Sequence, residues 1–173
     1  TCLIEEGCVN GTGLRRVLRF ATTVANIGNR DLFLGVPEDG KRGWSYAECH
    51  GHFHLDFYAD YDLRVVETGE SLDIGHKNGF CVLDIGVYDS ALAPTGCAGY
   101  DCSLQGISAG CYDTYSAGLQ CQWIDVTDVP AGDYEIMVTT NPDEELFELD
   151  YENNTATAVI RLTDTTVSVL DDE

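Results

Sequence analysis

The chain has 173 residues, of which 44% are hydrophobic and 10% aromatic, and it contains no apolar run near the roughly 20 residues that a membrane span requires. This composition is typical of a soluble globular protein; it excludes a membrane-spanning chain and argues against a disordered one. Thirty Asp and Glu against nine Lys and Arg give a net charge of −21, which would repel nucleic-acid phosphates and anionic lipids, so we expect no nucleic-acid or membrane partner.

The length predicts a single domain over residues 1–173, because it is that of one ordinary globular domain. Only two of the nine basic residues, Lys41 and Lys77, are lysines, while the acids are spread along the whole chain. A surface of hydrated carboxylates is typical of proteins from salt-loving organisms, where screening cancels the self-repulsion. We therefore expect a halophilic protein, with simple acidic drift as the alternative.

Short runs rich in β-branched residues, separated by Gly, Asp and Asn, predict strands along the chain. In chain order they cover residues 15–26, 63–67, 80–88, 122–126, 134–140 and 155–163. Helical periodicity is weak, although residues 108–119 could hold a short helix with Ser108 as its N-cap and Gly118 near its end. The expected fold is therefore mainly β: one antiparallel, β-sandwich-like domain with long loops, one short helix and several disulfides.

The cysteines predict the compartment. Eight of them, an even number without a Cys-x-x-Cys pair, favour disulfides over a zinc ribbon or a redox motif. Four bridges point outside the cytosol, so we expect a secreted or extracellular protein. The chain begins at Thr1 without Met or a leader, which we interpret as a mature or trimmed form.

Three of the four histidines lie in one five-residue window, at His50, His52 and His54. Alternate residues of a strand face the same side, so these imidazoles can share one face. A flat strand would separate the first and the last by roughly 13 Å, so one ion can bind all three only where the chain bends, and Gly51 would permit that bend. Imidazoles without a thiolate suit Cu(II), Zn(II) or Ni(II). The alternative is a solvated histidine cluster that binds no metal.

The fourth histidine, His76, stands beside Lys77, a dipeptide that normally marks an exposed turn. In a chain with two lysines, however, an ε-amine near a metal could act as a nucleophile. Residues 110–115, which end at Tyr115, and residues 121–129 carry aromatic and acidic side chains. Taken singly, neither segment identifies a function, since tyrosines are ordinarily core or surface aromatics.

Taken together, these segments resemble the catalytic domain of the lysyl oxidase family, which are secreted copper amine oxidases. The motifs run from Trp44 to Asn154 and cover most of the chain. A His-x-His-x-His triad combined with Cys-Tyr-Asp-Thr-Tyr and Cys-Gln-Trp-Ile-Asp motifs is highly specific. The matching stretches are Trp44 with 49–57, 75–77 with Phe80 and Cys81, 106–108 with 110–115, 121–125, and 150–154.

The resemblance implies roles for the residues of these motifs. His50, His52 and His54 correspond to the family's copper ligands. Lys77 and Tyr115 correspond to the two side chains that cross-link into lysine tyrosylquinone, a cofactor made from the protein itself. The implied reaction is the oxidation of a primary amine by O₂ to an aldehyde, with release of hydrogen peroxide and ammonia.

The resemblance leaves the substrate and the general base open. Small amines and peptidyl lysine are both chemically acceptable, so lysine-bearing proteins are candidate partners. Asp113, two residues before Tyr115, is a candidate base, although an alternating chain could equally point it away. His76 could supply a further copper ligand or merely orient its loop.

A second metal site is implied near the end of the chain. Residues 148–154 resemble the family's calcium-binding segment, with oxygen donors from Glu148, Asp150, Asn153 and Asn154. Hard oxygen ligands in a loop that enters a strand suit Ca(II). The alternative is an acidic turn that binds no ion.

The same resemblance implies the disulfide pairing and limits the functional alternatives. The expected pairs are Cys2 with Cys49, Cys8 with Cys121, Cys81 with Cys97, and Cys102 with Cys111. Two alternatives to the oxidase keep the three histidines: a catalytically silent extracellular metal-binding β-sandwich module, and a zinc-loaded precursor in which the quinone never forms. Only the oxidase requires a covalent link between Lys77 and Tyr115.

Overall fold

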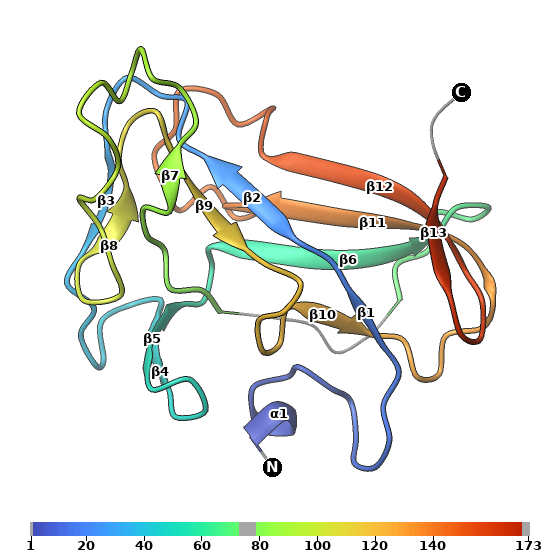
Figure 1. Cartoon of the computed structure of the whole chain (residues 1–173). Coiled ribbons are helices and arrows are strands. Elements are labelled where there is room, and N and C mark those ends of the chain that lie inside the picture. Colours follow the sequence, from blue (N-terminus) through green and yellow to red (C-terminus); the bar gives the residue numbers. More distant parts are fainter. Residues whose placement is uncertain (1, 73–78, 171–173) are drawn as a thin grey trace.

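The computed structural model describes residues 2–72 and 79–170, and Figure 1 shows their arrangement. These ranges contain one helical turn, α1 (Cys2–Glu5), and thirteen strands. The strands are β1 (Val17–Arg19), β2 (Thr22–Ala25), β3 (Leu32–Gly35), β4 (Trp44–Ala47), β5 (His52–Leu55), β6 (Ala59–Val65), β7 (Gly86–Val87), β8 (Gln105–Ile107), β9 (Cys111–Tyr115), β10 (Trp123–Asp125), β11 (Gly132–Thr140), β12 (Thr155–Leu162) and β13 (Val167–Val169). In the described part of the chain, no helix has the length and apolar character needed to cross a membrane.

Every strand pair in the described residues is antiparallel. The longest strands form a four-stranded sheet in the order β13-β12-β11-β6, which runs across the molecule in Figure 1. A three-stranded sheet has the order β2-β9-β7, and the pairs β1-β10, β3-β8 and β4-β5 complete the domain. The prediction of a mainly β, antiparallel fold with one short helix is therefore confirmed.

The predicted helix over residues 108–119 is wrong, because this segment contains strand β9 and the helical turn lies at the amino end instead. Cys111, Asp113 and Tyr115 are buried and the residues between them are half-buried, which is the alternation of a strand. β2 pairs along one edge of β9 and β7 along the other. These two partners outweigh the local Ser and Gly signals, since helix propensity is weak compared with tertiary contacts. The alternation places Asp113 and Tyr115 on one face.

The remaining strand predictions differ in accuracy. Four of the predicted runs coincide with β6, β10, β11 and β12, although the ends differ by up to a few residues. The run 15–26 is divided into β1 and β2. The run 80–88 holds only β7 and an isolated bridge between Phe80 and Leu55. Part of its backbone is bound by a side chain instead, because the amide of Val82 donates to Gln105 Oε1 at 2.9 Å.

Aromatic rings form the centre of the hydrophobic core. Phe80 is 1% exposed, and its ring makes edge-to-face contacts with three tyrosines. The centroid distances are 5.6 Å to Tyr58, 5.7 Å to Tyr61 and 4.9 Å to Tyr115. Such pairs contribute about 0.5–1.5 kcal/mol each beyond the burial of their area. The core therefore fixes the ring of Tyr115 in place.

Four disulfides link the cysteines of the described residues: Cys2–Cys49, Cys8–Cys121, Cys81–Cys102 and Cys97–Cys111. The first two are the expected pairs. The expected pairs of Cys81 with Cys97 and of Cys102 with Cys111 are wrong. The two observed bridges interlace along the sequence, whereas the expected ones would follow one another.

Backbone hydrogen bonds explain this exchange of partners. The amide of Asp84 donates to the carbonyl of Tyr100 at 3.3 Å, and the amide of Gly106 donates to the carbonyl of Val82 at 3.1 Å. Residues 100–106 therefore run beside residues 82–84. This alignment brings the Cα atoms of Cys81 and Cys102 to 5.4 Å, within the range that a disulfide spans.

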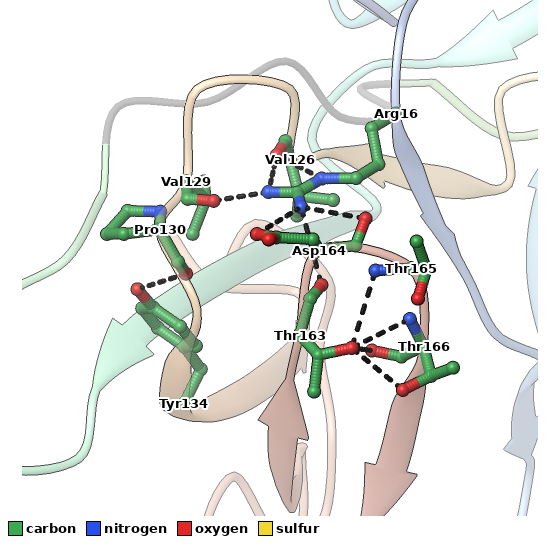
Figure 2. A network of polar contacts seen from close by, with 9 residues as sticks. All are labelled: Arg16, Val126, Val129, Pro130, Tyr134, Thr163, Asp164, Thr165 and Thr166. Atoms are coloured by element: carbon green, nitrogen blue, oxygen red, sulfur yellow. Dashed lines mark hydrogen bonds and ion pairs between the residues drawn. The ribbon is translucent and has the colours of Figure 1, made fainter.

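Arg16 ties the turn after β12 to the loop after β10, as Figure 2 shows. Its guanidinium donates to the carbonyl oxygens of Val126 and Val129. It also donates to the carbonyls of Thr163 and Asp164, at 3.3 and 3.2 Å. Figure 1 places this turn on the side of the molecule opposite β4 and β5, so the network stabilises the fold away from the histidine cluster.

Candidate active site

The histidine cluster lies on the hairpin formed by β4 and β5. The register pairs Ala47 with His52, so residues 48–51 form the turn. In this turn the amides of His50 and Gly51 donate to the carbonyl of Ala47 at 3.1 and 2.8 Å. Gly51 has a φ of +73°, a left-handed conformation that glycine adopts without a steric penalty. The bend that one shared ion requires is therefore present, and it occurs at Gly51.

The three imidazole rings converge. Ring centroids are 5.8 Å apart for His50 and His52, 5.1 Å for His50 and His54, and 5.0 Å for His52 and His54. The Nε2 atoms of His52 and His54 are 3.2 Å apart. Two nitrogens bound to one ion at about 2.0–2.1 Å lie roughly 2.8–3.4 Å apart, depending on whether the geometry is square-planar or tetrahedral. The spacing of these two nitrogens therefore fits a Cu(II) or Zn(II) ion shared by His52 and His54.

His54 is the most deeply buried of the three, at 6% exposure. Gly79 packs directly against it. A Cβ atom at this glycine would lie 2.6 Å from Nδ1 and 2.7 Å from Cβ of His54, closer than real contacts allow. The position therefore requires glycine, a constraint that the sequence alone did not reveal.

A cavity of about 330 Å³ opens beside His54. Its walls carry the carboxylates of Glu5, Glu6, Glu48 and Asp56. Carboxylates gathered around one concave surface produce a negative potential that attracts cations. The cavity therefore suits a positively charged group.

Glu6 makes a contact that the sequence analysis missed. Its Oε2 lies 3.0 Å from Nδ1 of His50, and the two side chains are 19% and 12% exposed. In the sequence Glu6 lies between Cys2 and Cys8, far from the histidines. The disulfide from Cys2 to Cys49 brings it there, since Cys49 precedes His50. The expected pairing of these two cysteines was the one available signal.

Tyr115 lies in β9 with its hydroxyl in the core. The hydroxyl donates to Asp113 Oδ2 at 2.5 Å, and the carbonyl oxygen of Cys81, a second acceptor for the same proton, lies 3.0 Å away. Burial, together with the negative charge of Asp113, raises the pKa of Tyr115 well above its ordinary value. Burial also raises the pKa of Asp113 to about 6, although hydrogen bonds from Tyr115 and the amide of Leu83 oppose this shift. Asp113 therefore points toward Tyr115, which decides between the two orientations that the sequence allowed.

Residues 79–82 connect the hairpin to Tyr115. On one side, the amide of Leu55 in β5 donates to the carbonyl of Phe80 at 2.8 Å. On the other side, the ring of Phe80 packs on the ring of Tyr115. One short segment thus contacts both parts of the site.

Two predicted residues, His76 and Lys77, lie outside the described residues. In the sequence they shortly precede Gly79, the first residue of the connecting segment. The described part of the site therefore consists of the three histidines, Tyr115 with Asp113, and the segment between them.

The residues predicted to bind calcium lie in the loop between β11 and β12. Glu148 Oε1 accepts hydrogen bonds from Nδ2 of Asn141 at 2.5 Å and from Nδ2 of Asn154 at 2.9 Å. Asp150 Oδ1 accepts from a backbone amide two residues later at 2.9 Å, and Asn153 is exposed in the same turn. The structure thus brings Glu148 and Asn154 together and leaves the other two on the exposed part of the loop. Asn141, which is 3% exposed, was missed because it precedes the motif by several residues.

Fold and site together define a disulfide-linked antiparallel β domain with three convergent imidazoles and a buried, hydrogen-bonded tyrosine. The family model described as Lysyl oxidase matches residues 2–171. The chain therefore belongs to the lysyl oxidase family.

Individual relatives agree with this assignment. Lysyl oxidase homolog 2 of Bos taurus is 37% identical over 162 residues, which cover 88% of this chain and 20% of that protein. Lysyl oxidase homolog 2A of Danio rerio is 38% identical over 161 residues, covering 88% and 21%. Lysyl oxidase homolog 3 of Homo sapiens is 36% identical over 162 residues, covering 88% and 21%. The chain spans about a fifth of the length of these curated relatives.

Proposed function

We propose that this chain is a copper- and quinone-dependent amine oxidase. It would convert primary amines, either peptidyl lysine or small amines, to aldehydes and release hydrogen peroxide and ammonia. The observation that carries the proposal is the convergence of the three histidine rings to centroid distances of 5.0–5.8 Å on a hairpin that contacts the same segment as Tyr115. Membership in the lysyl oxidase family supports it.

The donor set fits copper, since imidazole nitrogens suit Cu(II) and the Nε2 atoms of His52 and His54 have the spacing of two ligands of one ion. His50, His52 and His54 would hold it, with His76 as a further ligand or as a residue that orients the loop. When bound, copper would supply the activation of O₂ that oxidises the ring of Tyr115 to a quinone. Addition of the Lys77 amine would give a reduced adduct, which further O₂ would oxidise to lysine tyrosylquinone. Lys77 must be unprotonated to add, because only the neutral amine is a nucleophile.

Asp113 would accept the proton that Tyr115 must lose. A buried phenol whose pKa is raised stays protonated near neutral pH, so its ionisation requires an acceptor in direct contact. Asp113 Oδ2 is 2.5 Å from the hydroxyl, and with a pKa of about 6 it is mostly ionised at neutral pH. The same carboxylate lies beside the cofactor position and is the proposed base for the α-proton of the substrate.

The charge of the site supports cationic substrates. The cavity beside His54 is lined by four carboxylates, and the whole chain carries −21. This field would raise the local concentration of ammonium groups. Small amines or lysine-bearing proteins, together with O₂, are therefore the proposed partners. Four disulfides support secretion, and the acidic surface supports a halophilic source.

We also propose that Glu148, Asp150, Asn153 and Asn154 bind calcium. Carboxylate and amide oxygens are the donors that Ca²⁺ prefers. Asn154 directs Nδ2 toward Glu148, so it would have to rotate its amide to present Oδ1 to an ion. The calcium site therefore requires a local change of side-chain orientation, and the two amide orientations have nearly the same shape.

Mass spectrometry of the copper-loaded protein tests the oxidase proposal. The peptides that contain Lys77 and Tyr115 should appear as one cross-linked species, the protein should absorb visible light as a quinone, and amines should cause peroxide release. Lys77→Arg is the matched control, because a guanidinium keeps the charge and most of the length but stays protonated and cannot add.

Other outcomes identify the alternatives. Copper-loaded protein with the two peptides separate would overturn the oxidase and favour a catalytically silent metal-binding module. Zinc in the isolated protein, followed by cross-linking after exchange for copper, would identify a zinc-loaded precursor that matures into the oxidase. Substantial peroxide release from the arginine variant would show that Lys77 is not the cofactor nucleophile.

A further inference from the structure

We propose that Tyr58 is a cofactor-binding residue whose hydroxyl donates a hydrogen bond to a carbonyl oxygen of the quinone formed from Tyr115. The inference rests on the proposed function, because it requires the oxidation of Tyr115. It adds a phenol that directly follows residues 49–57, outside the stretches that carry the family resemblance.

The hydroxyl of Tyr58 is a buried polar group in the aromatic core. The residue is 2% exposed, and within the described part of the chain its hydroxyl oxygen has no hydrogen-bond partner. A buried hydroxyl that makes no hydrogen bond costs the free energy of its desolvation, so such groups are rare in folded proteins. A partner that forms only when the protein is chemically modified would explain why this one is kept.

Packing holds the ring of Tyr58 beside the tyrosine that would be oxidised. The ring of Phe80 contacts both, at centroid distances of 5.6 Å to Tyr58 and 4.9 Å to Tyr115. The carbonyl oxygen of Tyr58 accepts from the amide of Asn141 at 2.7 Å, which fixes the backbone as well. The hydroxyl therefore stays in the core.

The electrostatic environment keeps this hydroxyl protonated. Burial, followed by the negative charges of Asp113 and Glu148, raises the pKa of Tyr58 well above its ordinary value. Tyr58 in turn contributes to the raised pKa of Tyr115, after burial and the charge of Asp113. Such effects weaken with distance, so they agree with the packing in placing Tyr58 close to the reacting pair. Near neutral pH, Tyr58 is a proton donor.

Oxidation of Tyr115 changes what its ring presents to its neighbours. In the unmodified ring the hydroxyl donates to Asp113. One O₂ converts the phenol to an ortho-quinone: one oxygen atom adds to the neighbouring ring carbon, and the other leaves as water with the hydroxyl hydrogen and the displaced ring hydrogen. Both carbonyl oxygens of the product can only accept hydrogen bonds. The site thereby loses a donor and gains an acceptor, and the hydroxyl of Tyr58 supplies the missing proton.

Tyr58→Phe removes this hydroxyl and keeps the ring, and Tyr61→Phe is the matched control. The ring of Tyr61 packs on the same Phe80, at 5.7 Å, but its hydroxyl already accepts from Nε2 of Gln122 at 2.9 Å. In the metal-free protein before maturation, Tyr61→Phe should lower the melting temperature. Tyr58→Phe should leave it unchanged or raise it, because no hydrogen bond is lost.

Resonance Raman spectra of the matured proteins measure the carbonyl bonds of the quinone directly. A hydrogen bond to a carbonyl oxygen lowers its stretching frequency, so Tyr58→Phe should raise this frequency and Tyr61→Phe should keep the value of the parent. With copper removed, maturation should also stabilise Tyr58→Phe less than the other two proteins. The expected deficit is roughly 2- to 12-fold in the folding equilibrium constant, the net contribution of one hydrogen bond.

The outcomes separate the two proposals. If the parent protein forms no quinone, the proposed function fails and the role of Tyr58 fails with it. If the quinone forms in all three proteins and its carbonyl frequency in Tyr58→Phe equals that of the parent, the role of Tyr58 is overturned and the oxidase stands. Unmatured Tyr58→Phe that melts as far below the parent as Tyr61→Phe would also overturn it, because the hydroxyl would then have a partner before oxidation.

Discussion

Two segments of this molecule gather the side chains that we propose as metal ligands, and the contacts of these side chains differ between the two segments. In the hairpin of β4 and β5, imidazole rings face one another, with Nε2 atoms of His52 and His54 at 3.2 Å. In the loop between β11 and β12, the carboxylate of Glu148 accepts from the amides of Asn141 and Asn154. Ligand nitrogens that face one another gain from a shared cation, whereas a carboxylate with two amide donors is already compensated. We therefore expect the hairpin to depend on its metal far more than the loop does.

The largest expected effect is at the hairpin. His52→Ala should abolish copper retention and with it formation of the quinone, because biogenesis of the cofactor requires the ion. Metal analysis and visible absorption measure the two losses. Glu148→Gln, in the other segment, should keep both. His76→Ala should be milder than His52→Ala, and an equal loss would make His76 a copper ligand. A quinone in copper-free His52→Ala would contradict the prediction.

The packing of the hairpin should matter almost as much as its ligands. In Gly79→Ala the new Cβ would lie 2.6 Å from Nδ1 of His54, so the ring or the backbone must move. We expect copper affinity to fall roughly tenfold or more, as for other losses of ligand orientation. Gly118→Ala is the control, since its nearest neighbour would be Ser116 Oγ at 4.0 Å. Equal copper affinities of the two variants would show that the hairpin tolerates displacement of His54.

The pH dependence of kcat tests Asp113. The expected effect of this residue is smaller than that of the hairpin variants and larger than that of the loop variants. Its pKa is raised to about 6, so the base is lost as pH falls through 6 and kcat should fall with it. In Asp113→Asn activity should be low at all pH values and lack this inflection. A variant whose kcat keeps the parent's inflection near pH 6 would remove Asp113 as the base.

Stability should show the opposite dependence on pH. A raised pKa favours the protonated carboxyl in the native state, so its stabilisation is fully present below the unfolded pKa of about 3.9 and is lost as pH rises through about 6. Urea unfolding of the parent and of Asp113→Asn between these pH values measures the difference. If the free energy of unfolding changed with pH in the same way in both proteins, the Asp113 carboxyl would not be the group responsible for the pH dependence.

Calcium should have a smaller effect, confined to the loop. Millimolar calcium should raise the melting temperature by mass action on the native state, and Glu148→Gln should remove the shift without loss of copper. Differential scanning calorimetry with calcium or with a chelator measures it. A melting temperature that calcium does not change would mean that the amides of Asn141 and Asn154 alone stabilise Glu148. The segment would then be an acidic turn that binds no ion.

Salt should affect the charges of the whole surface, so its effect on stability should differ least between the hairpin and the loop. Screening relieves repulsion among 30 acidic residues, so the melting temperature should rise toward molar salt. The steering of cationic amines should fade as the Debye length falls to about 3 Å near 1 M, which lowers kcat/KM. Thermal unfolding and steady-state kinetics over one salt series test both effects. A flat or falling melting temperature would refute the halophilic interpretation.

Period-two patterns and special residue types were the parts of this fold that the sequence could predict. β11 alternates in burial along most of its length and β12 only at its carboxyl end, and both were recognised as strands. The histidine triad and the bend at Gly51 were also recognisable, because three of the chain's four histidines lie in one five-residue window. β9 was mistaken for a helix, since its strand character comes from β2 and β7 on either side and from no local signal.

The missed contacts have one physical feature in common. Glu6 reaches His50, and Gly79 reaches His54, only through the three-dimensional path of the chain. Glutamate and glycine are common residue types, and the residue type alone does not predict which distant residue the side chain or backbone contacts. The pairing of Cys81 with Cys102 was missed for the same reason, because it depends on how residues 100–106 align with a distant segment.

The disulfide between Cys2 and Cys49 has a consequence for the order in which the proposed oxidase would mature. It joins the turn that carries Glu6 to the turn that carries His50, so a chain with free thiols has no covalent tie between them. In the proposed oxidase, oxidation of the thiols should therefore precede loading of the metal, and loading should precede the oxidation of Tyr115. Maturation would then proceed through two successive oxidations, the first of sulfur and the second of a phenol, each preparing the geometry that the next step uses.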